Sequence, residues 1–137
     1  MAFERKKILL AEDDYDDRIF FLEHLNERED VELMPIAENG VEVLKYLDAL
    51  KSDDFPDLII LDQNMPMKNG IQTLEDLKSI ENFASIPVVI YSTYADNHLI
   101  ETCMNKGAET VVTKPLAKKE YGDMMDNFMQ TIILLKQ

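Results

Sequence analysis

"PDLIILDQNMPMKNG", residues 56–70, is the stretch that decides the fold. Residues 58–61 form an unbroken apolar run, which is typical of a parallel strand buried on both faces of a sheet. The run ends on an acid, Asp62, at the point where the chain should leave the sheet. A carboxylate at the end of a core strand predicts a polar site at that edge, provided that other strands end in the same way.

Short β-branched or leucine-rich runs alternate along the chain with longer stretches of helical period. We expect five strands, at residues 6–11, 31–37, 57–62, 86–92 and 110–114. Between and after them, apolar residues recur every three or four positions, as in residues 71–80 and 121–132. Strands that alternate with helices through short connections predict a parallel sheet with helices on both faces, which is a three-layer α/β sandwich.

One proline indicates where the second strand lies in the sheet. Pro35 lies inside the second expected strand, where it cannot donate a hydrogen bond to a neighbour, so this strand belongs at an edge of the sheet. The order 2-1-3-4-5 places it there. We therefore expect a flavodoxin-like (βα)5 fold in a single domain over residues 1–137, with its functional crevice at the carboxyl ends of the first and third strands.

Composition excludes several classes of function. The chain of 137 residues carries 27 acidic and 14 basic residues, a formal charge of -13, which repels nucleic-acid phosphates and anionic lipid. No apolar run reaches the roughly 20 residues that span a bilayer. The single cysteine, Cys103, cannot form an internal disulfide, and its surroundings indicate a small buried side chain. We expect a cytoplasmic protein with no direct nucleic-acid binding and no membrane insertion.

Acids and their counterparts gather at the expected strand ends. Glu12 and Asp13 follow the first strand, Asp62 ends the third, Ser92 ends the fourth and Lys114 ends the fifth. Clustered carboxylates repel one another and raise one another's pKa unless a cation lies among them. Oxygen ligands of this kind suit Mg²⁺, which keeps coordination positions open for a phosphate. One acid at a strand end is commonly a solvated loop residue or a helix cap, so the prediction rests on their convergence.

Four segments resemble, in order and in spacing, the signatures of response-regulator receiver domains. They are "ILLAEDD" (8–14), "PDLIILDQNMPMKNG" (56–70), "IPVVIYST" (86–93) and "VVTKP" (111–115). The resemblance covers essentially the whole chain and implies a role for each residue at the strand ends.

Asp62 takes the place of the phosphoacceptor in this resemblance. The resemblance also implies that Asp13 binds Mg²⁺ directly, that Glu12 binds it through water, and that Asn64 binds it through its backbone carbonyl. Ser92 would hydrogen-bond the phosphoryl group once it has formed. Lys114 would pair with the same group, and the next residue, Pro115, would follow a cis peptide bond.

A protein of this family is a phosphorylation switch of two-component or phosphorelay signalling. The resemblance implies that it accepts a phosphoryl group from a sensor histidine kinase or a histidine phosphotransfer protein. We expect a stand-alone receiver without an output domain, which signals by contact with a downstream protein that the sequence does not identify. Such a switch has built-in phosphorylation and dephosphorylation chemistry but is not a turnover enzyme.

Two other classes of function use a fold or a nucleophile of this kind. A degenerate receiver, acting as an unphosphorylated binding module, would be expected to have lost an acid, the hydroxyl or the lysine, and all of them are present. A phosphohydrolase with an aspartate nucleophile normally needs a second acid two residues further on, and this position holds Asn64. The switch is therefore the preferred interpretation.

Two departures from the family pattern leave alternatives open. Val111 stands three residues before Lys114, where the family usually has an aromatic ring that moves on activation. Either the loop after Ser92 transmits activation through its backbone, or Tyr91 or Tyr94 takes the place of that ring. We expect the large Tyr94 side chain to lie across the path of water and to prolong the life of the acyl phosphate; the alternative is that the ring points away into a partner-binding face.

The segment "RIFFLEHL", residues 18–25, is apolar over more than one face. Phe21 and Leu25 are expected to pack inward, while Ile19, Phe20 and Leu22 remain partly outside. Spare apolar surface beside a site favours a docking patch, and in the family this helix and the loop after the fifth strand meet the phosphodonor. A helix that is simply buried more widely is an equally acceptable reading.

Overall fold

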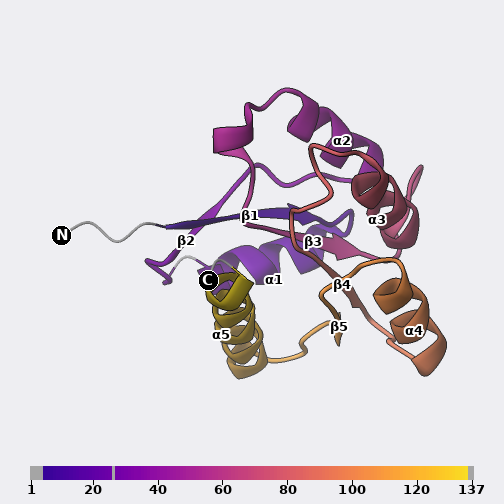
Figure 1. Ribbon diagram of the computed structural model, residues 1–137. Helices are drawn as coiled ribbons and strands as arrows, with labels where there is room; N and C mark the ends of the chain where they lie inside the picture. Colours follow the sequence, from indigo (N-terminus) through magenta and orange to yellow (C-terminus); the bar gives the residue numbers. More distant parts are fainter. Residues whose placement is uncertain (1–4, 26, 136–137) are drawn as a thin grey trace.

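The computed structural model describes residues 5–25 and 27–135. Strands and helices alternate along these residues (Figure 1). The strands are β1 (Lys6–Ala11), β2 (Val31–Leu33), β3 (Leu58–Asp62), β4 (Val88–Ser92) and β5 (Thr110–Thr113). The helices are α1 (Tyr15–Leu25), α2 (Gly40–Asp48), α3 (Gly70–Ser79), α4 (Asn97–Asn105) and α5 (Lys118–Leu135), with a short 3-10 turn, η1 (Ser52–Asp54), before β3.

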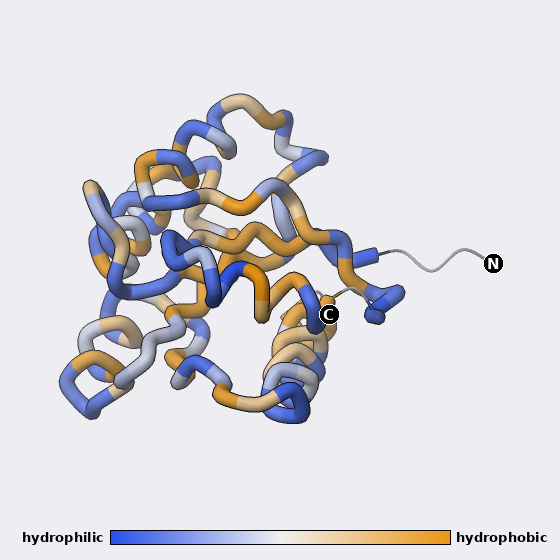
Figure 2. Tube along the Cα trace, turned by 180° about the vertical axis from the view of Figure 1, so that it is seen from behind, coloured by the Kyte–Doolittle hydropathy of each residue, from blue (hydrophilic) through white to orange (hydrophobic). Residues whose placement is uncertain are grey.

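The strands form one parallel sheet in the order β2-β1-β3-β4-β5, which confirms the flavodoxin-like topology. Helices α1 and α5 cover one face of the sheet, and α2, α3 and α4 cover the other (Figure 1). A separate apolar cluster fills each interface. Because β3 and β4 lie in the middle of the sheet, all five residues of each are buried, as their continuous apolar character predicts. The apolar strands run through the interior of the hydropathy view, between helices of mixed character (Figure 2).

The second strand is shorter than expected. Pairing with β1 runs from Lys6 opposite Val31 to Ile8 opposite Leu33, and an isolated bridge then joins Ala11 to Ala37. The offset between partners grows from 25 residues (31 minus 6) to 26 (37 minus 11), so one extra residue is accommodated around the exposed Pro35. A proline lacks the N–H that a regular ladder requires, which explains why the strand ends early and lies at an edge.

Helices α1 and α5 pack as their sequence patterns predict. Phe21 and Leu25 are buried against the sheet, whereas Phe20 is 55% exposed on the outer face of α1. The methionines of α5 belong to the core beside Tyr121, on which the His24 ring stacks with centroids 4.5 Å apart. The single cysteine is fully buried on α4. No helix of the described residues is both long and apolar enough to cross a membrane.

Two glycines in helices should respond to alanine in opposite ways. A Cβ at Gly40, the first residue of α2, would collide with Oγ1 of Thr73, which is fully buried on α3 and donates a hydrogen bond to the Asn69 carbonyl at 2.7 Å. Gly40→Ala should therefore lower the free energy of unfolding by about 1–3 kcal/mol. Gly122 lies inside α5 with open space around it, so Gly122→Ala should raise the free energy of unfolding by about 0.5–1 kcal/mol.

Urea denaturation of both variants measures these two effects. Adding Thr73→Ala to Gly40→Ala removes the colliding oxygen, so the double variant should lose less stability than the two single losses combined. Strict additivity would show that the α2–α3 contact does not cause the loss.

Candidate functional site

Three acids meet at the carboxyl edge of the sheet. Glu12 follows directly after β1, and its backbone N–H donates to the Ala37 carbonyl at 2.9 Å. Ala11 pairs with Leu61, so Glu12 and Asp62 leave their neighbouring strands at the same level. Carboxylate oxygens of Glu12, Asp13 and Asp62 all lie within 4.8 Å of one another. Glu12 and Asp62 are buried, whereas Asp13 is exposed and forms the open side of the cluster.

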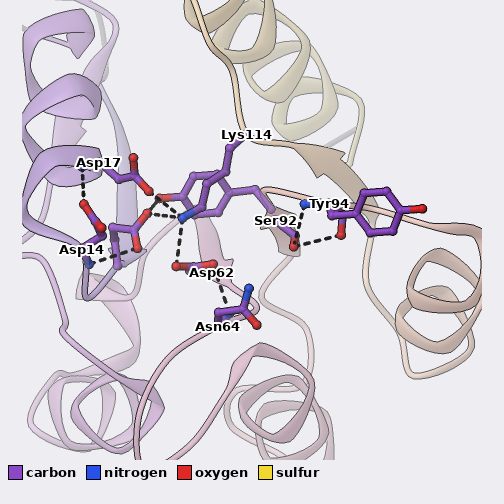
Figure 3. A network of polar contacts seen from close by, with 9 residues as sticks. Asp14, Asp17, Asp62, Asn64, Ser92, Tyr94 and Lys114 are labelled. Atoms are coloured by element: carbon purple, nitrogen blue, oxygen red, sulfur yellow. Dashed lines mark hydrogen bonds and ion pairs between the residues drawn. The ribbon is translucent and has the colours of Figure 1, made fainter.

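Lys114 joins these acids from the end of β5. Its backbone N–H donates to the Ser92 carbonyl at 2.8 Å, which fixes it beside β4. Its ammonium contacts carboxylates of Glu12 at 2.8 Å, Asp17 at 2.8 Å and Asp62 at 3.0 Å (Figure 3). Burial works against the ammonium, but the three hydrogen bonds outweigh that effect and raise the pKa of Lys114. One largely enclosed cation therefore compensates the charge of three carboxylates.

Glu12 has the most unusual environment of the site. It is fully buried, and its Oε1 accepts hydrogen bonds from the Tyr91 hydroxyl at 2.6 Å and from Lys114 at 2.8 Å. Its Oε2 accepts a longer bond, at 3.3 Å, from the Asp14 backbone N–H. Burial and the proximity of Asp62 raise the pKa of Glu12 from 4.5 to about 7, although Lys114 and Tyr91 stabilise the ionised form. A cation added beside Glu12 would favour the ionised carboxylate.

Ser92 is engaged with its own loop. Its hydroxyl donates to the Tyr94 carbonyl at 3.1 Å and accepts from the Tyr94 backbone N–H at 3.4 Å. The Tyr94 ring is 76% exposed and points away from Asp62 and Lys114 (Figure 3). The expectation that the ring covers the site is therefore wrong, and the structure has the alternative arrangement.

The loop after β3 adds one direct contact to the phosphoacceptor candidate. The Asn64 backbone N–H donates to Asp62 Oδ1 at 3.1 Å (Figure 3).

On the other side of the site, the expectation of a cis peptide before Pro115 is wrong, because the described residues contain no cis peptide bond. The trans form is the default, since even a proline favours it by roughly 0.5–1 kcal/mol.

Two residues of the site were missed by the sequence reasoning. Asp17 reaches Lys114 from the first turns of α1. The sequence predicts for Tyr91 only a place in a strand or the role of a moving ring, but it is 1% exposed and its hydroxyl donates to Glu12. The pairing of the strands could have indicated that Tyr91 belongs to the site. Tyr91 pairs with Asp62 across β3 and β4, so a polar atom on its side chain would be delivered to the same edge.

The raised pKa of Glu12 makes stability depend on pH. Between about pH 4.5 and 7 the folded protein holds a proton on Glu12 that the unfolded chain has released, so the free energy of unfolding falls as the pH rises through this window. The shift of 2.5 (7 minus 4.5) corresponds to at most roughly 3–4 kcal/mol. Urea denaturation of metal-free protein should show this loss in the parent and a flatter pH dependence in Glu12→Gln. Equal slopes would mean that another group carries the proton.

With the site in view, comparisons with known proteins agree on one family. The chain belongs to the response regulator receiver domain family, whose model matches residues 8–126. The receiver prediction is therefore confirmed, and with it the assignment to two-component signalling.

Several curated proteins resemble this chain in sequence, over different shares of their own length. Sporulation initiation phosphotransferase F of Bacillus subtilis is 30% identical over 124 residues, 90% of this chain and 94% of that protein. Protein-glutamate methylesterase/protein-glutamine glutaminase of Clostridium acetobutylicum is 30% identical over 94% of this chain. The chain spans only 29% to 55% of the length of that relative and three further curated ones.

Two solved structures share the fold over most of both chains. The phosphorylated cyanobacterial phytochrome response regulator RcpA is 27% identical with a TM-score of 0.80, covering 94% of each chain. The Mn²⁺-bound form of response regulator Rcp1 is 28% identical with a TM-score of 0.74, covering 87% of this chain and 88% of that one.

Proposed function

We propose that this receiver, as one unit over residues 1–137, accepts a phosphoryl group on Asp62 and signals through the resulting change of shape. One observation carries the proposal. The Asp62 carboxylate is almost fully buried at the end of a core strand, contacts the Lys114 ammonium at 3.0 Å, and lies within 4.8 Å of the carboxylates of Glu12 and Asp13. The phosphorylated state of the similar regulator RcpA supports the same chemistry.

The acid cluster fits a hard divalent cation. Its ligand atoms are carboxylate oxygens, which Mg²⁺ and Mn²⁺ prefer, and one of the acids is open to solvent. Glu12, Asp13 and Asp62 would hold the ion, and the Asn64 backbone carbonyl is proposed as a further ligand. When bound, Mg²⁺ supplies positive charge to the oxygens of the incoming phosphoryl group. The Mn²⁺-bound form of the similar regulator Rcp1 supports this assignment.

The transfer requires little acid–base help from the protein. A carboxylate oxygen of Asp62 forms a bond to phosphorus as the bond from phosphorus to the donor imidazole nitrogen breaks, and that nitrogen then takes a proton from solvent. Lys114 already touches Asp62, so its ammonium lies where negative charge accumulates on the phosphoryl oxygens. The chain acts by positioning and charge compensation, which is why we propose a switch rather than a turnover enzyme.

Ser92 is the proposed sensor of the phosphoryl group. Its hydroxyl now donates to the Tyr94 carbonyl, and it must leave that carbonyl before it can donate to a phosphoryl oxygen. The loop after β4 then loses a hydrogen bond that holds its shape. Val111 is half-buried in β5 and Tyr91 is fixed by Glu12, so this backbone change is the proposed route of activation.

The proposed donor is a sensor histidine kinase or a histidine phosphotransfer protein in the cytoplasm. A groove of about 320 Å³ lies beside the site, between α1 and the loop that follows β5. Phe20 and His24 line it from α1, Pro115 and Leu116 line it from the loop, and Asp17 connects it to Lys114. Exposed apolar groups beside the phosphoacceptor fit a docking surface for the donor, while the downstream protein is a separate partner.

A small phosphodonor tests the proposal. The full chain is incubated with acetyl phosphate in Mg²⁺ or in EDTA, and the intact mass is measured. We expect a gain of one phosphoryl group in Mg²⁺ only. The absence of any adduct would leave the chain as a binding module, and an equal adduct in EDTA would contradict the metal requirement.

A second prediction tests the metal ligands through stability. Mg²⁺ should raise the melting temperature of the parent, because an ion that binds only the folded state stabilises that state. Asp13→Asn should abolish the rise, since it removes the exposed carboxylate of the cluster. Asp14→Asn is the matched control, because this neighbouring acid accepts a hydrogen bond from the Asp17 N–H and lies outside the cluster. Differential scanning calorimetry measures all three proteins, and equal rises would place the ion elsewhere.

A further inference from the structure

Tyr91 is a buried tyrosine in a strand whose preceding residues, 88–90, are all apolar. All five residues of β4 are buried, and Tyr91 is among the largest side chains that are fully enclosed. Phenylalanine would fill the same space without a hydroxyl that needs a partner. Here the partner is the Glu12 carboxylate at 2.6 Å, and burial and that carboxylate raise the pKa of Tyr91, which keeps the hydroxyl protonated and able to donate.

The Tyr91 hydroxyl differs from the other strong donor to Glu12. Lys114 also donates to Oε1 of Glu12, but it divides its ammonium among Glu12, Asp17 and Asp62. Any phosphoryl group that arrives on Asp62 would compete for that ammonium. The Tyr91 hydroxyl donates to Glu12 alone, so it is not divided among several carboxylates.

The ring of Tyr91 is held on two sides. Phe21 of α1 contacts it in an edge-on arrangement, with centroids 6.4 Å apart and planes at 68°. The Lys114 ammonium lies 5.0 Å from the ring centroid, within the range of a cation–π contact. A ring fixed in this way delivers its hydroxyl to one place.

We propose that Tyr91 is a positioning residue for the metal site, because its hydroxyl fixes the Glu12 carboxylate toward Asp13 and Asp62 through a hydrogen bond separate from that of Lys114. The inference rests on the proposed metal site and extends it by a residue that does not touch the ion. Removal of a group that orients a metal-binding side chain typically costs 10- to 100-fold in affinity.

Titration calorimetry with Mg²⁺ alone, on the metal-free full chain, tests the proposal. Tyr91→Phe keeps the ring and removes only the hydroxyl, and its dissociation constant for Mg²⁺ should rise about tenfold. In a Glu12→Gln background the same substitution should leave the dissociation constant unchanged, because the oriented carboxylate is already absent. Tyr121→Phe is the matched control. This tyrosine is buried in the same aromatic cluster, donates no described hydrogen bond to Glu12, and should keep the parental affinity.

The outcomes separate this inference from the proposed function. If the parent binds Mg²⁺, Asp13→Asn abolishes that binding and Tyr91→Phe leaves the dissociation constant unchanged, the role of Tyr91 is overturned. The metal site itself is then retained. A loss of equal size in the parental and Glu12→Gln backgrounds also overturns it, since the hydroxyl would then act on the fold and not on Glu12. If the parent binds no Mg²⁺, or binds it equally well after Asp13→Asn, the proposed metal site itself is overturned.

Discussion

Asp62→Asn should abolish phosphoryl uptake completely. The asparagine amide matches aspartate in shape but has no anionic oxygen to attack phosphorus, and no neighbouring acid can replace it by position. Glu12 is fully buried with Oε1 already bonded to Tyr91 and Lys114, and Asp13 is at the open side of the cluster. Intact-mass analysis after incubation with acetyl phosphate and Mg²⁺ measures the loss.

The control for this variant is Asp14→Asn. Asp14 is one residue beyond the acid pair and is exposed, so this variant should take up one phosphoryl group as the parent does. An undiminished adduct in Asp62→Asn would place the phosphoryl group on another residue and would contradict the central proposal.

Lys114→Met should produce the largest loss of stability. The methionine keeps most of the apolar length of the side chain but leaves three carboxylates without their shared cation, two of which are nearly inaccessible to solvent. Removing one partner of a buried ion pair commonly costs about 3–5 kcal/mol. Urea denaturation in EDTA at about pH 8, which lies above the pKa of Glu12 at about 7, should show a loss of this size, and Mg²⁺ should recover part of it.

Lys118→Met provides the comparison. This lysine is 72% exposed and pairs with Glu27 at 3.6 Å on the surface. Solvent screens such a pair, so its loss should change stability by less than about 0.5 kcal/mol. Equal effects of the two substitutions would mean that the ion cluster at Lys114 contributes no more than a surface pair.

The fold was predictable because its central strands carry their own signal. Residues 58–61 and 88–91 have no polar side chain facing either layer except Tyr91, so only a doubly covered parallel strand accommodates them. The differences lie at the strand ends and have local causes. β3 begins one residue late because the Asp57 carboxylate accepts from the Lys7 backbone N–H at 2.8 Å, and β4 begins after Pro87, which has no N–H to donate.

The candidate site was predictable only where the strand ends themselves supplied the residues. The register of a parallel sheet brings the ends of neighbouring strands together, however the helices pack on the sheet. This accounts for the convergence of Glu12, Asp62 and Lys114. Asp17 and Tyr91 required contacts between residues 97 and 79 positions apart in the sequence. These contacts depend on how α1 is rotated on the sheet and on which face of the sheet the Tyr91 side chain lies, and no local pattern fixes either quantity.

The short second strand also bears on self-association. The outer edge of a sheet offers unpaired N–H and C=O groups, to which a strand from another molecule can add. β2 extends over three residues only, and beyond it the chain carries an exposed proline and one extra residue in its pairing with β1. An incoming strand would find neither a regular ladder nor a donor at Pro35. The residue that places this strand at the border of the sheet thus also protects that border against intermolecular strand addition, the first step of β-type aggregation.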